Sequence, residues 1–238
     1  MQDNENIVSI KNLTKKYGNL VALKNINLDF PKGKIIGLLG PNGSGKTTII
    51  KLIVNLLSQY EGNIKVDGKD IGIETKKVVA YLPDKDYLNK SWTFKDAIEY
   101  FSDFYDDFDI NKAYRLVEEL KIPTNVKFKA LSKGTREKLQ LILVLSRNAK
   151  IYLFDEPIAG VDPVARDLVF KLILENHAEG SSVVISTHLI LDCENILDYV
   201  IFLKNGEIAL RSNVDELRKA TGKSINDVFK EVFAYENY

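Results

Sequence analysis

The stretch GPNGSGKT, residues 40–47, stands between an apolar run and a segment of helical periodicity. The apolar run KIIGLLG (34–40) predicts a buried strand, and after GKTT the apolar side chains recur at the spacing of one helix face. The stretch fits the full pattern of a phosphate-binding loop, and a strand before it with a helix after it is the context that such a loop requires. We therefore predict a P-loop nucleotide-binding core.

Each part of this loop has a chemical role. The glycines allow backbone N–H groups to turn toward phosphate oxygens, Lys46 reaches the β- and γ-phosphates, and Thr47 offers its hydroxyl to Mg²⁺. The loop residues expected to bind the nucleotide are Gly40, Asn42, Gly43, Ser44, Gly45, Lys46, Thr47 and Thr48. ATP and Mg²⁺ are thus the expected ligands, and Lys46 is also a candidate catalytic residue.

Two acidic residues end a second buried strand. In IYLFDEP (151–157), the apolar residues predict a strand that delivers Asp155 and Glu156 to its carboxyl end, where ligands gather in open α/β sheets. We expect Asp155 to hold Mg²⁺, usually through water, and Glu156 to polarise the water that attacks the γ-phosphate. His188 follows the next predicted strand, SVVIS (182–186), at the same sheet edge. Glu156 and His188 are therefore candidate catalytic residues, the histidine as a γ-phosphate contact.

The composition limits the classes of partner. Basic and acidic residues are balanced at 33 each, so the basic surface typical of nucleic-acid binders is not expected, and nucleic acid is not a predicted partner. The single cysteine, Cys193, cannot form an intramolecular disulfide, and the first residues lack the pattern of a signal peptide, which favours a cytoplasmic protein. The longest apolar runs, such as LQLILVLS (139–146), are too short to span a membrane. Any link to a membrane is therefore expected to run through a partner.

Strand and helix signals alternate along most of the chain. Short β-rich runs dominate the first third, and the alternation returns after residue 148. Between them, at about residues 93–147, apolar positions recur almost wholly at helical spacing, and Pro123 ends the second apolar stripe. We call this segment the helical block. This order predicts an α/β fold with a mostly parallel sheet covered by helices. We expect one domain, with residues 1–92 and 148–238 as the nucleotide-binding core and the helical block inserted into it.

With these motifs in order, the chain resembles the ATP-binding subunits of ABC transporters over nearly its whole length, from LTKKYGNLVALKNINLDF (13–30) to YVIFLKNGEI (199–208). The resemblance implies a P-loop core with an N-terminal antiparallel β subdomain and an inserted α-helical subdomain. It also implies that two subunits, as a homodimer or with a paralogous ATPase subunit, close head to tail around two ATP molecules. The partner it implies in the membrane is a separate transmembrane permease subunit.

The resemblance also assigns roles to residues outside the P-loop. LSKGT (131–135) is similar to the family's signature motif, so Ser132 and the backbone of Gly134 are expected to contact the γ-phosphate bound on the other subunit. A helix N-terminus suits this task because its unpaired N–H groups attract anions. By the same resemblance, Asp162 in AGVDP is expected to cross the dimer interface, and Tyr17 is expected to stack on adenine.

Two positions depart from the family's pattern. The usual signature is LSGGQ, and here Lys133 and Thr135 replace a glycine and the glutamine. Lys133 either adds positive charge near the phosphates or points to solvent. In YLPD (81–84), Asp84 stands where the family usually has a glutamine that contacts Mg²⁺ and links the nucleotide site to the transmembrane partner. We still expect an oxygen of Asp84 to meet Mg²⁺, directly or through water, so this departure concerns the coupling step more than ATP binding.

Residues 213–238 predict a C-terminal helical tail. Ser224 is placed to cap its last helix, whose apolar side chains form one stripe. The tail either packs on its own subunit or docks a second copy. The segment SINDVFKEVF (224–233) resembles the tails of ATPase subunits in exporter-type ABC systems, which favours export over uptake.

These observations lead to one main hypothesis. We predict an ATP-hydrolysing subunit that dimerises on ATP, powers a separate permease for export, and lies at the inner face of the cell membrane through that partner. The alternatives are a soluble ABC-type ATPase that works on ribosomes or DNA repair complexes, and a non-catalytic nucleotide-binding regulator. The residues leave the transported substrate open.

Overall fold

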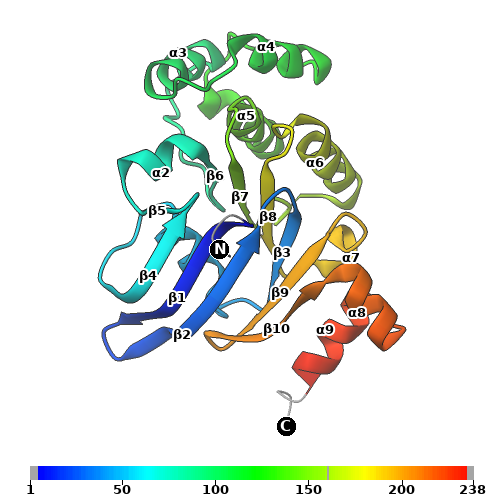
Figure 1. The fold of residues 1–238 in the computed structure, drawn as a ribbon. Helices are drawn as coiled ribbons and strands as arrows, with labels where there is room; N and C mark the ends of the chain where they lie inside the picture. The colour runs from blue at the N-terminus through cyan, green and yellow to red at the C-terminus, as the bar shows by residue number, and fades with distance from the viewer. Residues whose placement is uncertain (1–4, 160, 235–238) are drawn as a thin grey trace.

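The computed structural model, which describes residues 5–159 and 161–234, contains two β-sheets with helices around them (Figure 1). The larger sheet has six strands in the order β10-β9-β3-β8-β7-β6. Its strands are β3 (Ile35–Leu39), β6 (Val79–Leu82), β7 (Ile151–Asp155), β8 (Ser182–Thr187), β9 (Tyr199–Lys204) and β10 (Glu207–Asn213). All neighbouring pairs are parallel except β9 with β10. The carboxyl ends of β3, β7 and β8 therefore meet at one edge of the sheet.

The smaller sheet is antiparallel, in the order β2-β1-β4-β5. Its strands are β1 (Asn6–Tyr17), β2 (Leu20–Pro31), β4 (Tyr60–Val66) and β5 (Lys69–Asp70). Helix α1 (Lys46–Ile53) shares one hydrophobic core with both sheets, because Ile49, Ile50 and Leu52 are buried among their apolar side chains. The apolar stripe predicted after GKTT thus joins the two sheets and fixes the P-loop between them.

A second hydrophobic core covers the opposite face of the larger sheet, where Tyr152 and Phe154 of β7 are fully buried. The helices that contribute buried side chains to it are α3 (Phe94–Phe104), α4 (Ile110–Glu119), α5 (Lys133–Leu145), α6 (Pro163–Asn176), α7 (Ile190–Cys193), α8 (Val214–Thr221) and α9 (Ile225–Phe233). Helix α2 (Ile73–Val78) leads into β6. Helices α3 and α4 lie at one end of the molecule and α8 and α9 at the other (Figure 1).

The fold class predicted from the sequence is confirmed, because the chain combines a mostly parallel sheet, an antiparallel sheet and surrounding helices. The helical block is interrupted close to Pro123, where the sequence predicts the end of a helix. Helix α4 ends at Glu119, and the fully described stretch 120–132 contains only a short 3-10 helix, Phe128–Ala130. Lys121 has a left-handed φ of 52°, which is incompatible with a continuing helix and ends α4 before Pro123.

The C-terminal helices pack on their own chain. Ser224 caps α9 as predicted, and the Phe229 ring centroid of that helix lies 5.3 Å from that of Phe202 on β9. Lys204 Nζ donates a hydrogen bond to the Val232 carbonyl oxygen at 3.0 Å. These contacts support the interpretation of a tail packed on its own subunit; its last predicted residues, 235–238, lie outside the described residues. Within the described ranges, no helix is both long and apolar enough to cross a bilayer.

Candidate functional site

The loop GPNGSGKT joins β3 to α1 and encloses the ammonium group of its own lysine. Lys46 Nζ donates hydrogen bonds to the carbonyl oxygens of Gly40 and Pro41, at 2.8 and 3.2 Å. Glycine is required at Gly40, where an added Cβ would lie 2.4 Å from the Leu203 carbonyl oxygen. It is also required at Gly45, whose φ is 111°. Gly45 begins α1 without a side-chain cap from the described chain, so the first N–H groups of that helix are available to an anion.

A cavity of about 680 Å³ opens in front of the loop, a volume that suits a small organic ligand. The predicted site residues that line it are Tyr17, Asn42, Gly43, Ser44, Gly45, Lys46, Thr47, Thr48, Asp84 and Glu156. The fold therefore brings together side chains from four separate parts of the sequence. Tyr17 is 43% exposed, which leaves ring surface for a stacked base. We call this space the nucleotide cavity.

Asp155 is fully buried at the carboxyl end of β7. Its Oδ1 accepts hydrogen bonds from Thr47 Oγ1 at 3.0 Å and from Ser186 Oγ at 2.6 Å, whereas its Oδ2 has no hydrogen-bond partner among the described residues. Burial raises the pKa of Asp155, and the neighbouring carboxylates of Asp84 and Glu156 add to that effect. A buried oxygen without a partner is a position that a cation would stabilise, so this donor set fits Mg²⁺.

Glu156 is held through both its backbone and its carboxylate. Its φ of 51° is left-handed, which is unusual for glutamate, and its N–H donates to the carbonyl oxygen of Ser186 at 3.0 Å and to the Ser186 Oγ at 3.1 Å. Its carboxylate lies 3.2 Å from Lys46 Nζ and 3.0 Å from His188 Nδ1. All three candidate catalytic residues thus form one contiguous chain of contacts at the sheet edge.

The segment LSKGT does not contribute to the nucleotide cavity of its own chain, as far as the described residues define that cavity. Ser132 is the N-cap of α5, where its Oγ accepts a hydrogen bond from the Thr135 N–H at 3.2 Å and lies 2.8 Å from the Thr135 hydroxyl. Gly134 and Asp162 line a second cavity of about 660 Å³. Glu156 lines both cavities, so the two spaces adjoin at the candidate base.

Two further side chains of this region have defined positions. The Lys133 side chain is 65% exposed, and its Nζ lies 3.5 Å from Glu137 Oε1. Lys133 also lines the second cavity beside Gly134, so the choice between its two alternatives stays a prediction. Asp162 begins α6, where its Oδ1 accepts a hydrogen bond from the Ala165 N–H at 3.1 Å.

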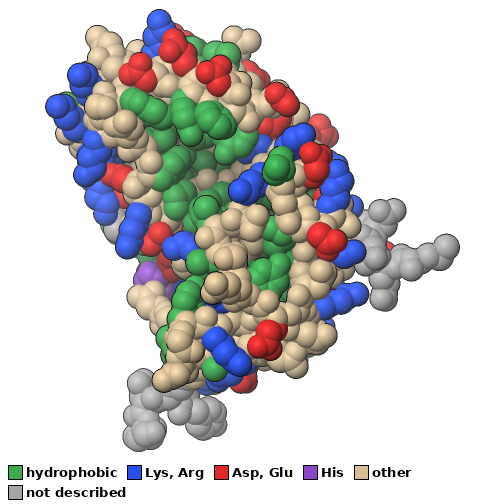
Figure 2. Space-filling model, turned by 90° about the vertical axis from the view of Figure 1, so that its left-hand side faces the viewer, with side chains coloured by type: hydrophobic (Ala, Val, Ile, Leu, Met, Phe, Trp, Pro, Cys, Tyr) green, Lys and Arg blue, Asp and Glu red, His purple; other side chains and the backbone are tan. Residues whose placement is uncertain are grey.

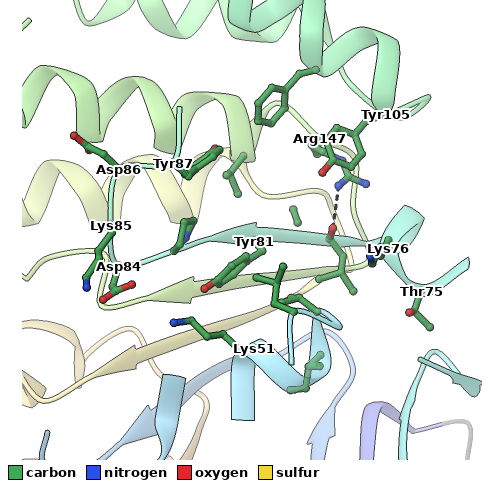
Figure 3. Close-up of a pocket in the computed structure, with 18 residues that line it drawn as sticks. Lys51, Thr75, Lys76, Tyr81, Asp84, Lys85, Asp86, Tyr87, Tyr105 and Arg147 are labelled. Atoms are coloured by element: carbon green, nitrogen blue, oxygen red, sulfur yellow. Dashed lines mark hydrogen bonds between the residues drawn. The ribbon is translucent and has the colours of Figure 1, made fainter. Parts of the chain in front are cut away.

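A separate groove of about 560 Å³ is lined by residues of α1, β6, α3 and α5. Figure 2 shows hydrophobic side chains gathered around a hollow in this face of the molecule. Asp84 lies at one end of the groove, and Arg147 lies with Tyr105 at the other (Figure 3). Arg147 is buried, its Nη1 donates to the Val79 carbonyl oxygen at 2.9 Å, and its Cζ lies 3.7 Å from the Tyr105 ring centroid. Asp84 lines both this groove and the nucleotide cavity.

Comparison with known proteins identifies the family. The sequence profile described as ABC transporter matches residues 23–159, more than half of the chain. The ABC transporter ATP-binding protein YtrB of Bacillus subtilis (strain 168) is 31% identical over 216 residues, which cover 90% of this chain and 74% of YtrB. The chain belongs to the ABC transporter family. It is an ATP-binding subunit of that family, whose ATPases hydrolyse ATP for transport.

Two further proteins resemble this ABC subunit over most of its length. The subunit is 30% identical to LptB of Haemophilus influenzae, the lipopolysaccharide export system ATP-binding protein, over 214 residues that cover 85% of this chain and 88% of LptB. A solved structure described as the ATP binding subunit of an ABC transporter superimposes with a TM-score of 0.84 at 25% identity, covering 95% of this chain and 99% of that one. The predicted family and fold are therefore confirmed.

Two features of the site in this ABC subunit were not predicted from its sequence. One is the direct contact between Lys46 and Glu156. The other is Ser186, which contacts both Asp155 and Glu156. A signal for Ser186 was present, because a serine that follows the apolar run VVI in a predicted buried strand needs a hydrogen-bond partner.

Proposed function

We propose that the ABC subunit binds ATP in the nucleotide cavity and hydrolyses it with Lys46, Glu156 and His188. The observation that supports this assignment most strongly is the chain of contacts from Lys46 through the Glu156 carboxylate to His188, at 3.2 and 3.0 Å. Phosphoryl transfer mainly requires an aligned nucleophile and neutralised charge. Lys46 would neutralise charge on the transferred phosphate, Glu156 would orient the attacking water, and His188 would contact the γ-phosphate while it holds Glu156.

Thr47, Asp155 and Asp84 would hold Mg²⁺, which supplies positive charge to the β- and γ-phosphates when it is bound. Thr47 gives its hydroxyl proton to Asp155, so the lone pairs of the Thr47 oxygen stay available to a metal. The glycines and N–H groups of the P-loop would bind the phosphates. Tyr17 would stack on the adenine from the outer wall of the cavity.

A second subunit would complete the site. Gly134 and Asp162 line a cavity other than the one before the P-loop, and the first N–H groups of α5 suit an anion. We propose that Ser132 and Gly134 contact the ATP bound by another subunit, either a second copy or a paralogous ATPase subunit, and that Asp162 lies in the interface. Two such sites would then close head to tail, and ATP would be part of the contact.

The groove is the proposed docking site of a transmembrane permease subunit. An apolar, aromatic lining suits an amphipathic helix of that partner. The helical block, proposed here as an inserted subdomain between core segments 1–92 and 148–238, forms one wall of the groove. Asp84 lines both the groove and the nucleotide cavity, so a partner that displaces Asp84 in the groove would also change the lining of the nucleotide cavity. This arrangement would hold the ABC subunit at the inner face of the membrane.

Export is the proposed direction of transport. Support comes from the likeness to LptB, whose name assigns it to an export system, and from the resemblance of the tail segment 224–233 to those of exporter-type subunits.

The test is the molar mass of Glu156→Gln, measured by light scattering with and without ATP and Mg²⁺. Loss of the base should lower turnover by roughly 100-fold or more and leave ATP binding intact, so the variant should accumulate as a dimer only when ATP is present. The matched control is Glu179→Gln, an exposed glutamate between α6 and β8, which should hydrolyse ATP at the original rate. Unchanged turnover in Glu156→Gln would contradict its role as the base. A persistent monomer with ATP bound would contradict the homodimer.

A further inference from the structure

Ser186 connects the two acidic residues that follow each other at the end of β7. It lies near the end of the neighbouring strand β8 and is fully buried. Its hydroxyl donates to Asp155 Oδ1 at 2.6 Å and accepts from the Glu156 N–H at 3.1 Å. Because the β7 and β8 register pairs Asp155 directly with Ser186, the sheet itself sets this contact.

The contact fixes the orientation of the Asp155 carboxylate. Ser186 and Thr47 both donate to Oδ1, and Oδ2 keeps no hydrogen-bond partner among the described residues. A buried carboxylate oxygen without a hydrogen-bond donor is unfavourable. If the Ser186 and Thr47 hydroxyls were free to move, the Asp155 carboxylate would rotate so that each of its oxygens had a donor. The two hydroxyls thus keep Asp155 Oδ2 available to a metal ion.

The same serine also holds the backbone of Glu156. That residue has a φ of 51°, and non-glycine residues keep such a conformation only when their surroundings determine it strongly. The Glu156 N–H finds both of its acceptors on Ser186, the carbonyl oxygen at 3.0 Å and the hydroxyl at 3.1 Å. The placement of the Glu156 carboxylate against Lys46 and His188 follows from this backbone position.

We propose that Ser186 is a positioning residue that aligns the metal-binding carboxylate of Asp155 and the backbone of Glu156 through one hydroxyl group. The inference rests on the proposed function of these two acids. Ser186 is not among the described residues that line the nucleotide cavity, so it acts through Asp155 and Glu156 and not on ATP itself. Hydrogen bonds of this kind to a metal ligand set both its orientation and its affinity for the metal.

A purely structural serine on the same strand provides the matched control. Ser182 lies at the opposite end of β8 and is 1% exposed. Its Oγ accepts a hydrogen bond from the Gly33 N–H at 2.9 Å. Ser182 pairs with Ile151 at the start of β7, at the opposite end of that strand from Asp155. Ser182→Ala removes the same group from the same buried strand without a contact to Asp155 or Glu156.

The experiment measures Mn²⁺ affinity by electron paramagnetic resonance in the presence of the ATP analogue AMP-PNP. It also measures the affinity for AMP-PNP without metal, and kcat and KM for ATP. Ser186→Ala should bind Mn²⁺ about 10-fold more weakly and lose a similar factor in kcat, while the metal-free nucleotide affinity stays unchanged. Ser182→Ala should change none of these values. Ser186→Thr keeps the hydroxyl and suits a strand, so it should recover most of the Mn²⁺ affinity.

Equal Mn²⁺ affinity in Ser186→Ala and the original protein would overturn this inference and leave the proposed site standing. An equal loss in Ser186→Ala and Ser182→Ala would overturn it as well, because the effect would then be general to β8. Failure of the original protein to bind Mn²⁺ with AMP-PNP would overturn the proposed metal site and this inference together. If Ser186→Ala does not fold, Ser186→Cys replaces it, because the thiol keeps the volume and is a weaker donor.

Discussion

Asp67 forms ion pairs that connect the two sheets of this ABC subunit. It lies in the turn between β4 and β5 of the smaller sheet, with a φ of 49°. Its Oδ2 is 2.7 Å from the Nζ of Lys150, which precedes β7 of the larger sheet, and its Oδ1 is 3.5 Å from Lys32 Nζ. The hydrogen bond from Lys150 lowers the pKa of Asp67 below its ordinary value of 3.8.

This lowered pKa predicts a stability difference that depends on pH. The contribution of the Asp67 carboxylate is present above pH 3.8 and is lost as the pH falls through the lowered pKa of the folded state. Asparagine tolerates the left-handed φ, so Asp67→Asn removes the charge without straining the turn. The free energy of unfolding of the variant should be lower than that of the original protein by about 0.5 kcal/mol at pH 7, and equal to it at about pH 2. Urea unfolding at both pH values checks this, with Asp167→Asn on the exposed face of α6 as the control. A deficit that persists in acid would assign the effect to the turn and not to the charge.

At the scale of residues, the sequence predicted the functional groups that belong to continuous motifs. The P-loop was predictable because strand, glycines, lysine and helix are consecutive, and Asp155 with Glu156 because a buried strand delivers them to its end. The role of Ser186 depends on the register between β7 and β8, which no local pattern determines. The contact of Lys46 with Glu156 depends on the strand order β3-β8-β7, which places the P-loop near the end of β7 and which is established only in the folded sheet.

At the scale of elements, hydrophobic periodicity predicted the strands and helices, and Pro123 predicted the end of one helix. The runs 34–40, 151–155 and 182–186 form β3, β7 and β8 to within a residue at each end, because apolar runs of this length occur in sheets buried on both faces. Helix α4 ends at Glu119, four residues before the predicted end at Pro123, and the length of the non-helical stretch up to α5 was not predicted. Phe128 is buried there, so the stretch keeps apolar residues although it is not α-helical. Periodicity reports which residues are buried, and in this stretch burial does not require a helix.

Arg147 carries a prediction about how the helical block is attached. Its guanidinium pairs with both carboxylate oxygens of Asp107, at 2.7 and 3.0 Å. It also donates to the carbonyl oxygens of Val79 in β6 and Lys77 in α2, at 2.9 and 2.8 Å. Lysine cannot reproduce this fork, so Arg147→Lys should lower the free energy of unfolding by about 2–3 kcal/mol. Urea unfolding measures the change. Arg211→Lys is the control, because Arg211 is exposed on β10. Equal urea midpoints for the two variants would show that the fork does not attach the block.

At the scale of the whole molecule, the P-loop and Gly134 of the segment LSKGT (131–135), here called the signature segment, line adjoining but different cavities. The nucleotide cavity holds Tyr17 and the P-loop, and the second cavity holds Gly134 and Asp162. A symmetric pair of subunits would bring each P-loop to the partner's α5 and use both surfaces twice. A consequence of that geometry is that damage to the P-loop of one subunit and damage to the signature segment of the other fall in the same ATP site and leave the second site intact.

Mixing two defective subunits tests this geometry. Lys46→Ala removes the P-loop cation, and Ser132→Asp places a negative charge against the γ-phosphate while an aspartate still caps α5. Each variant alone should be inactive. A mixed dimer has one site with both Lys46 and Ser132 intact, so an equimolar mixture should recover roughly a quarter of the original turnover, because half of the dimers are mixed and each has one working site. Steady-state ATP hydrolysis measures the recovery, and two affinity tags establish that mixed dimers are present. If mixed dimers form without any recovery, Ser132 and Lys46 do not meet across the interface, and the head-to-tail arrangement is wrong.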